Sequence, residues 1–435
     1  MSRRLWQARG SGWLPFLLLM SAMLLSLLPS QVFASAQDAQ REAGAGGSGT
    51  SVYEAQVAPE ATPGAEAQGG RLAGDLAEQQ SGELDMTQIE QFWDRLRSQY
   101  GGYFPDGQVP DLKALMFPQG QGWEMKHALV GLARFFLHEV LYSGKLLVTI
   151  VLLAIFTMIL ETMQSAFERN AVSRVAYAVA YMVLLIIAVN SFRTATTYAA
   201  DAIGSMVQFM LSMVPLLLTL LASTGGVTTV AVLHPLIVFM IHTIGTVIHL
   251  VVFPLLFFSA VLHLTSTISD RFKLTQLANL LRTISVGLLG GMLTLFLGVL
   301  SIQGATGAVA DGIAMRTAKF VTGNFVPVVG RMFSDAADTV LSASMLVKNA
   351  VGLAGVAILL FLCAFPAIKV LTLALIYNVS AAVLQPLGDT PIVQCLQTIG
   401  KTLIYVFAAL ASVGLMFFLA VTIILTAGNA SLLMR

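Results

Sequence analysis

The sequence predicts an all-α, polytopic integral membrane protein with about seven to nine transmembrane helices. From Leu146 to Thr426 one apolar run follows another, each about as long as a membrane-spanning helix, with short and weakly charged connectors. Hydrophobic residues make up 56% of the chain and charged residues only 11%, whereas a water-soluble domain carries about 25% charged residues. We therefore expect most of this protein to fold in lipid.

Residues 1–34 have the three-part form of a cleavable signal peptide. Arg3, Arg4 and Arg9 form the basic start, Leu14–Leu28 is the apolar stretch, and Val32-Phe33-Ala34 offers small residues at the expected cleavage positions. An uncleaved anchor helix is the alternative. Cleavage places the mature N-terminus outside the cytoplasm.

Residues 35–85 form an acidic segment rich in Ala, Gly and Gln. It holds too few apolar residues to offset its ordering entropy, which predicts a disordered linker. Order is expected to begin at Thr87, because Thr87 and Glu90 have the spacing of a capping box.

Residues 86–144 then predict an extracytoplasmic region of amphipathic helices. Two apolar stripes support it: Ile89, Phe92, Trp93 and Leu96, and later Met125, Leu129, Leu132, Phe136 and Val140.

Residues 145–435 predict the multi-span membrane domain. Its apolar segments lie near residues 146–164, 175–192, 206–223, 229–249, 251–268, 281–302, 350–368, 370–387 and 402–426. Joining the pairs around Pro254 and Pro366 into two long helices reduces the count to seven. Either count places the C-terminus opposite a secreted N-terminus, and the positive-inside rule then places Arg169, Arg174 and Arg271 in the cytoplasm.

Nothing in the sequence predicts a cofactor, a metal site or nucleic-acid binding. His234, His242, His249 and His263 share one side of a continuous helix, but neighbours seven or eight residues apart lie about 10–12 Å from each other along its axis. They are expected to hydrogen-bond between helices rather than share a metal ion. Cys363 and Cys395 are expected to pack as small apolar residues. The scattered basic residues, with a net charge of +1, exclude a phosphate-backbone surface.

Catalysis is not expected either. Glu161, Glu168, Asp270 and Asp389 all fall at the ends of predicted spans, so no pair of carboxylates lies at membrane depth. That pattern argues against a proton-driven carrier and an intramembrane aspartyl protease. The sequence predicts that the protein is not an enzyme.

Two features suggest contacts between helices or with partners. Gly287 and Gly291 have the four-residue spacing that lets helix backbones approach closely, which predicts a helix-packing face. Residues 303–348 form an interrupted amphipathic segment, in which Pro327 and Gly330 are expected to break any helix. The segment is either a connector lying on the surface or a re-entrant element that lines a pore or contacts a partner. The candidate residues for that contact are Lys319, Asn324, Pro327, Gly330, Asp335 and Lys348.

Several ordered strings resemble the stage III sporulation protein AE family. They are Ala318–Phe320, Asn324–Gly330, Ser334–Ala336, Leu346–Gly352, His234–Leu236, Pro366–Lys369, Gln385–Asp389 and Gly414–Phe418. The resemblance extends from about Gly131 to Asn429.

The resemblance implies a multi-pass protein in the mother-cell membrane that surrounds the forespore of endospore-forming bacteria. It also implies membership of a transenvelope channel complex that supports forespore development and late forespore gene expression. The implied partners are other membrane proteins of the stage III sporulation operon and a forespore membrane protein. The family supplies no catalytic residues.

Two other functions stay open at this stage. The spans around Pro254 and Pro366 resemble the discontinuous helices of an autonomous secondary transporter or permease. An enzyme acting within the membrane would depend on residues such as His234, His242 or Asp335.

Overall fold

A computed structural model provides the structure of this chain. It describes residues 76–77, 79–80, 82, 84–104, 110–117, 125–166, 171–268, 274–325, 329–388 and 390–433. All of them belong to one compact unit, Pro63–Arg435. The predicted signal peptide and most of the predicted linker lie outside the described residues.

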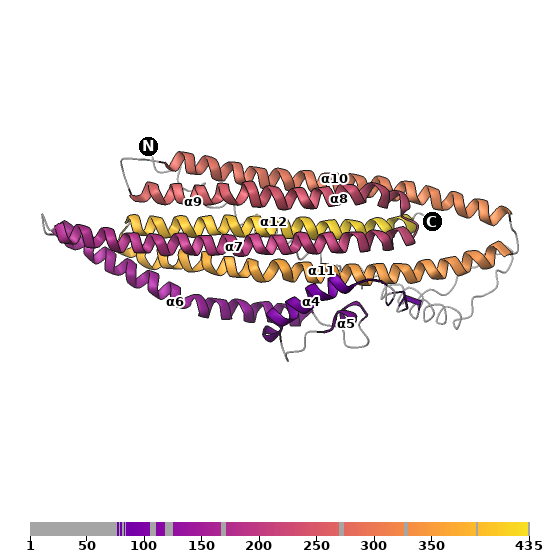
Figure 1. Ribbon diagram of the computed structural model, residues 1–435, viewed down its shortest axis with the longest axis horizontal. Helices are drawn as coiled ribbons and strands as arrows, with labels where there is room; N and C mark the ends of the chain where they lie inside the picture. The colour runs from indigo at the N-terminus through magenta and orange to yellow at the C-terminus, as the bar shows by residue number, and fades with distance from the viewer. Residues whose placement is uncertain are drawn as a thin grey trace, which may run out of the picture. The chain divides into compact units, whose positions relative to one another are not determined.

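The described residues form helices and no strands, and Figure 1 shows the long helices α6 to α12 lying side by side. Helices α6 (Met125–Ala166) and α7 (Ala171–Ser223) come first. Helix α8 (Val227–Val247) continues through a π-helical turn, Ile248–Val252, into α9 (Phe253–Ile268), so the three segments form one long helix. Helices α10 (Thr275–Phe325), α11 (Val329–Leu384) and α12 (Pro391–Leu433) complete the set.

Shorter helices precede this set in the chain: α4 (Thr87–Tyr100), η2 (Gly101–Tyr103) and α5 (Leu112–Met116). A further short turn, η5 (Gln385–Leu387), joins α11 to α12.

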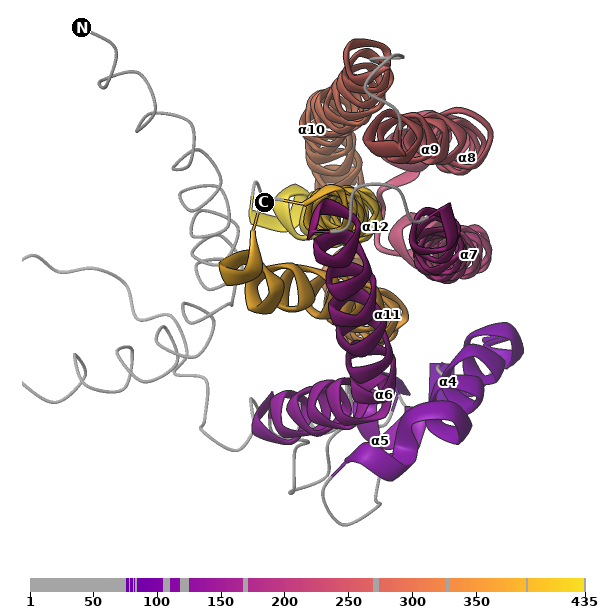
Figure 2. The ribbon, with the colours of Figure 1, turned by 90° about the vertical axis from the view of Figure 1, so that its left-hand side faces the viewer.

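Helices α7, α11 and α12 form the centre of the bundle, and each contacts the other two. Helices α8, α9 and α10 pack on one side of this group, and α6 packs against α7 and α11 on the other, as the end view in Figure 2 shows. Short connections make consecutive helices antiparallel neighbours. The centre of the bundle therefore combines α7, from the middle of the chain, with the last two helices.

Among the described residues six helices are long and apolar enough to cross a membrane, fewer than the seven to nine predicted. The pairs around Pro254 and Pro366 are each continuous, as the alternative prediction had it, and the segments 175–192 and 206–223 also form one helix. Proline is tolerated inside such helices because neighbouring groups satisfy the freed carbonyl. Six single crossings place the residues before α6 and after α12 on the same side, so the predicted opposite placement of the termini does not follow.

Helix α7 joins two predicted spans because the stretch between them is amphipathic. Phe192, Ala195 and Ala199 are buried, whereas Arg193 and Asp201 are exposed on the opposite side. That alternation has helical periodicity, and the prediction treated these residues as a connector.

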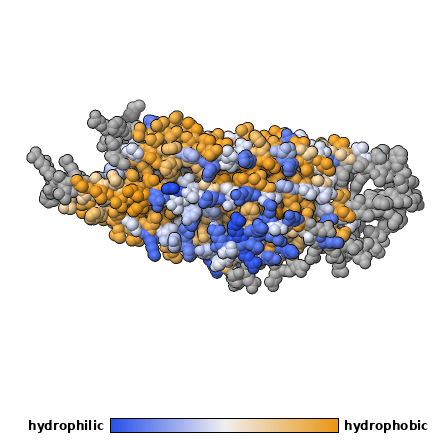
Figure 3. Space-filling model, viewed as in Figure 1, coloured by the Kyte–Doolittle hydropathy of each residue, from blue (hydrophilic) through white to orange (hydrophobic). Residues whose placement is uncertain are grey.

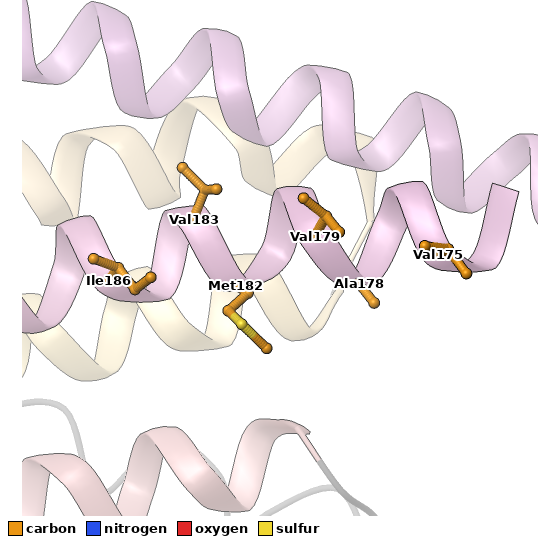
Figure 4. Close-up of a pocket in the computed structure, with 6 residues that line it drawn as sticks. All are labelled: Val175, Ala178, Val179, Met182, Val183 and Ile186. Atoms are coloured by element: carbon orange, nitrogen blue, oxygen red, sulfur yellow. The ribbon is translucent and has the colours of Figure 1, made fainter. Parts of the chain in front are cut away.

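The surface of α7 changes character along its length. Near its N-terminus six apolar side chains surround a shallow cavity of ≈ 360 Å³, shown in Figure 4: Val175, Ala178, Val179, Met182, Val183 and Ile186. Val175 is 63% and Ile186 60% exposed, as expected for a surface in contact with lipid. From Arg193 to Gln208 the exposed residues of α7 are mostly polar, which fits water rather than hydrocarbon.

Helix α10 keeps an apolar surface for much longer. Leu277 and Ile313, which are 47% and 62% exposed, mark the ends of its exposed apolar residues. Figure 3 shows apolar residues over this helix, whereas polar residues gather over α4 and the beginning of α6. Thirty-six residues span ~54 Å of helix, against ~30 Å for the hydrocarbon core. The exposed apolar surface of α10 is therefore longer than the hydrocarbon core is thick.

The region before α6 differs from the prediction in three details. The carboxylate of Asp85 accepts the backbone N–H of Thr87 at 3.2 Å, so Asp85 caps α4 in place of the predicted capping box. Ala77, inside the predicted linker, is buried, and Gln80 accepts a hydrogen bond from Ser344. The predicted stripe containing Leu129 is not the buried face of α6.

The residues that α6 buries lie one position away from that stripe. They are Ala128, Gly131, Phe135 and Glu139, whereas Leu129 is 62% exposed. Residues 125–144 also continue into the first candidate span as one helix.

Candidate functional site: the hairpin of α10 and α11

The predicted interrupted segment, residues 303–348, forms the second part of α10 and the first part of α11. The chain leaves α10 at Phe325 and enters α11 at Val329, so the segment is a helical hairpin. Pro327 lies in the connector, outside the described residues. Within the described backbone the segment is helical on both sides of its connector, and its role as a surface connector or a re-entrant element stays a prediction.

Four of the candidate contact residues have helical backbones, but their side chains lie outside the description. They are Lys319 and Asn324 at the end of α10 and Gly330 and Asp335 at the start of α11. The pore or partner contact predicted for them stays a prediction.

Lys348 is the candidate whose side-chain environment is defined. It is fully buried, and its Nζ donates a hydrogen bond to the backbone carbonyl of Leu425 in α12 at 3.3 Å. One helical turn further along α11, Gly352 faces the same Leu425, and a Cβ there would overlap its side chain. Lys348 therefore joins α11 to α12 inside the bundle, away from any surface.

Asp311 fixes the other arm of the hairpin, and the sequence analysis did not identify it. This buried carboxylate accepts hydrogen bonds from the backbone N–H groups of Thr228 and Thr229, at 2.9 and 3.1 Å, and from the hydroxyl of Thr229. Those N–H groups belong to the first turn of α8, whose N-cap position is Gly226 and has no side chain to offer. Asp311 therefore caps α8 from α10, where the helix dipole also favours a negative charge.

Two signals in the sequence point to this cap. Asp311 is an acidic residue in an otherwise apolar stretch, and Gly225 and Gly226 precede α8 without a capping side chain. Gly307, one turn before Asp311, lies against Thr229 so closely that a Cβ there would meet its backbone at 3.0 Å. The close approach of α10 to α8 depends on this glycine.

Gly287 and Gly291 have no such contacts. Both are exposed, and no atom outside the local helix lies within 4 Å of a Cβ built on either one. Other described glycines do lie closely against neighbouring helices, among them Gly352, Gly355 and Gly414, which face Leu425, Met213 and Cys363. A packing role for Gly287 and Gly291 would require another chain.

Helix α4 binds to the centre of the bundle through aromatic side chains. Tyr100 stacks on Phe365 with ring centroids 3.8 Å apart, and Trp93 lies 6.3 Å from Phe361, also in α11. The indole N–H of Trp93 donates to the carbonyl of Pro110 at 2.9 Å. Burial, with a further contribution from the nearby Glu139 carboxylate, raises the pKa of Tyr100 to about 12.

Three of the four histidines predicted to share one side of a helix lie on the protein surface. His234, His242 and His249 are exposed along α8 and the π-helical turn. His242 and His249 line a shallow groove of ≈ 400 Å³ between α7 and α8, together with Gly204, Gln208 and Thr246. Among the described residues no three His, Cys, Asp or Glu side chains lie close enough together to hold a metal ion.

Comparison with known proteins identifies the family. Residues 111–428 match the family model described as stage III sporulation protein AE. The chain is 52% identical over 364 residues to stage III sporulation protein AE of Bacillus subtilis (strain 168), covering 83% of this chain and 91% of that protein. No solved structure is significantly similar. The chain therefore belongs to the stage III sporulation protein AE family.

Proposed function

We propose that this protein is a non-enzymatic membrane component of the transenvelope channel complex that links mother cell and forespore during endospore formation. In this role it supports forespore development and late forespore gene expression. Its family membership, which extends over residues 111–428, carries the proposal. We place it in the mother-cell membrane around the forespore, with other membrane proteins of the stage III sporulation operon and a forespore membrane protein as partners.

The architecture supports a role in an assembly. The exposed apolar face of α10 continues from Leu277 to Ile313, ~54 Å, which is longer than ~30 Å of hydrocarbon can cover. An apolar surface beyond the lipid is stabilised when another protein covers it. The buried cap formed by Asp311 and the amine of Lys348 anchor the two arms of the hairpin to the rest of the bundle. A firmly held hairpin offers a partner a preformed surface.

The charges support a mature N-terminus outside the cytoplasm. With six crossings and that orientation, Arg169, Arg271 and Lys273 fall in cytoplasmic connectors, as the positive-inside rule prefers. The connector between α10 and α11 then lies on the extracytoplasmic side, toward the forespore membrane.

A genetic replacement in a spore former tests the proposal. The native gene is deleted and this chain is supplied in trans, and a late forespore-specific reporter is measured after engulfment. We expect the deletion to silence the reporter and this chain to restore it. A deletion strain with full late reporter activity would show that the channel role is wrong.

One observation favours the alternative of an autonomous transporter. The groove beside His242 and His249 lies next to a π-helical turn, and such turns often occur at functional sites. Liposomes holding this protein alone distinguish the two functions. Solute flux without partners supports the transporter, whereas flux only after partners are added supports the channel subunit.

A further inference from the structure

A cluster of basic side chains lies where α9, α10 and α12 meet. Arg282 of α10 lies over the ring of Tyr405 of α12, with its guanidinium carbon 5.2 Å from the ring centroid. His263 of α9 lies within electrostatic range of both Arg282 and Lys401, and Lys401 lies one turn before Tyr405 on α12. Three cationic or protonatable groups from three helices thus converge.

Hydrogen bonds between α9 and α10 fix this arrangement. The hydroxyl of Ser259 donates to the carbonyl of Ala278 at 2.7 Å, and the hydroxyls of Ser266 and Thr275 lie 2.9 Å apart. His263 lies one turn after Ser259, so the same face of α9 turns it toward α10. The position of the cluster is set by buried contacts rather than by flexible side chains alone.

The cluster lacks an acidic partner in the described part of the chain. Neither Arg282 nor Lys401 forms an ion pair with a described carboxylate, and the guanidinium of Arg282 bonds the side-chain oxygen of Asn279. The Nε2 atom of His263 is buried without a hydrogen-bond partner among the described residues. Like charges gathered in this way repel one another unless an anion joins them.

We propose that this cluster binds a phosphate group and that an anionic phospholipid supplies it. His263 and Arg282 lie near the ends of their candidate spans, Thr267 and Thr275, where lipid headgroups are found. Lys401 is exposed on a long flexible stem that reaches the same level, and Tyr405 adds an aromatic surface typical of the membrane interface. Basic pockets between transmembrane helices bind phospholipid headgroups in this way. A guanidinium matches the geometry of phosphate oxygens.

The test uses the full chain purified in a neutral detergent. Native mass spectrometry counts bound phosphatidylglycerol or phosphatidylcholine, and inorganic phosphate is the third probe. We expect phosphatidylglycerol to bind more tightly than phosphatidylcholine. The Lys401→Gln variant is expected to weaken that binding about fivefold, and Arg282→Gln with Lys401→Gln about twenty-five-fold, since each basic group contributes about fivefold.

Arg193→Gln, an exposed arginine of α7 outside the cluster, serves as the matched control and is expected to retain full binding. Lys401→Arg keeps the charge and is expected to restore binding. If the double variant fails to fold, the phosphatidylglycerol binding of the single Lys401→Gln variant, which changes an exposed residue, tests the proposal. Equal binding of the two lipids, or equal loss in Arg193→Gln, overturns the proposal. Competition by inorganic phosphate alone at micromolar concentration would overturn the lipid assignment.

Discussion

Helices α12 and α10 are both long and strongly apolar, yet they have different surroundings. In the most apolar part of the α12 span 50% of the residues are buried, and in that of the α11 span 56% are buried. In the corresponding part of α10 only 22% of the residues are buried. Lipid tails are as apolar as leucine, so hydropathy does not tell a helix that faces protein from one that faces lipid. The difference instead appears in the small and polar residues.

Glycines and buried polar groups show this difference most clearly. Gly352 and Gly355 on α11 and Gly414 on α12 lie against side chains of neighbouring helices. Gly287 and Gly291 on the outer part of α10 have no such neighbour within 4 Å. Further along, α10 does make close contacts: Gly304 lies against Ile423 of α12, and Gly307 and Asp311 contact Thr229 of α8.

The largest predicted effect concerns α4, which binds the central helix α11. Trp93→Ala removes a side chain that is 2% exposed and is expected to cost about 3–5 kcal/mol in the free energy of unfolding. Denaturant titration in mixed micelles measures this loss in the free energy of unfolding. Leu129→Ala on the outer face of α6 is the control and should change stability little, because Leu129 is 62% exposed. Equal stability of the two variants would mean that α4 does not bind the bundle as described.

The second prediction concerns the cap of α8. Asp311→Ala leaves the N–H groups of Thr228 and Thr229 without an acceptor and is expected to lower the free energy of unfolding by about 1.5–3 kcal/mol. Hydrogen exchange of the backbone amides in the first turn of α8 should also become faster. Asp201→Ala, an exposed acid on α7, should leave both quantities unchanged. Unchanged exchange in Asp311→Ala would contradict the cap.

The third prediction compares the two helices directly. Gly414→Leu pushes a side chain into Cys363 and is expected to destabilise the protein by about 1–3 kcal/mol. Gly291→Leu, which meets no atom within 4 Å, should leave the unfolding midpoint unchanged. If Gly291→Leu nevertheless prevents sporulation while the purified protein keeps its stability, this face of α10 contacts another chain. Similar destabilisation by both changes would show that the two environments are alike.

The smallest predicted effect lies between α9 and α10. Ser259→Ala removes the 2.7 Å hydrogen bond to Ala278 and is expected to cost about 0.6 kcal/mol, a typical value for a hydrogen bond between membrane helices. Ser205→Ala is the control, because the hydroxyl of Ser205 bonds only a carbonyl of its own helix. A loss no greater than that of Ser205→Ala would show that the bond does not stabilise the contact between α9 and α10.

The sequence was sufficient for the class of fold and for the stripe of α4 that contains Ile89, Trp93 and Leu96, which the structure buries. It was insufficient for the number of spans, since Pro254 and Pro366 do not end their helices and the residues around Arg193 form an amphipathic helix. The candidate site was harder still. The partner of Asp311 lies 82 or 83 residues away in the chain, and no local pattern encodes that pairing.

The π-helical turn at Ile248–Val252 makes one place in this chain tolerant of deletion. There the N–H of Phe253 bonds the carbonyl of Ile248, five residues back, and Pro254 has no N–H to donate to Leu250. A π-helical turn holds one residue more than an α-helix needs. Deleting Leu250, which is 66% exposed, would convert the turn to α-helix and leave Ser259 and His263 facing α10. Deleting one residue from regular α9 would instead rotate its remaining part by ~100°. The length of this long helix is thus adjustable by one residue at a single point.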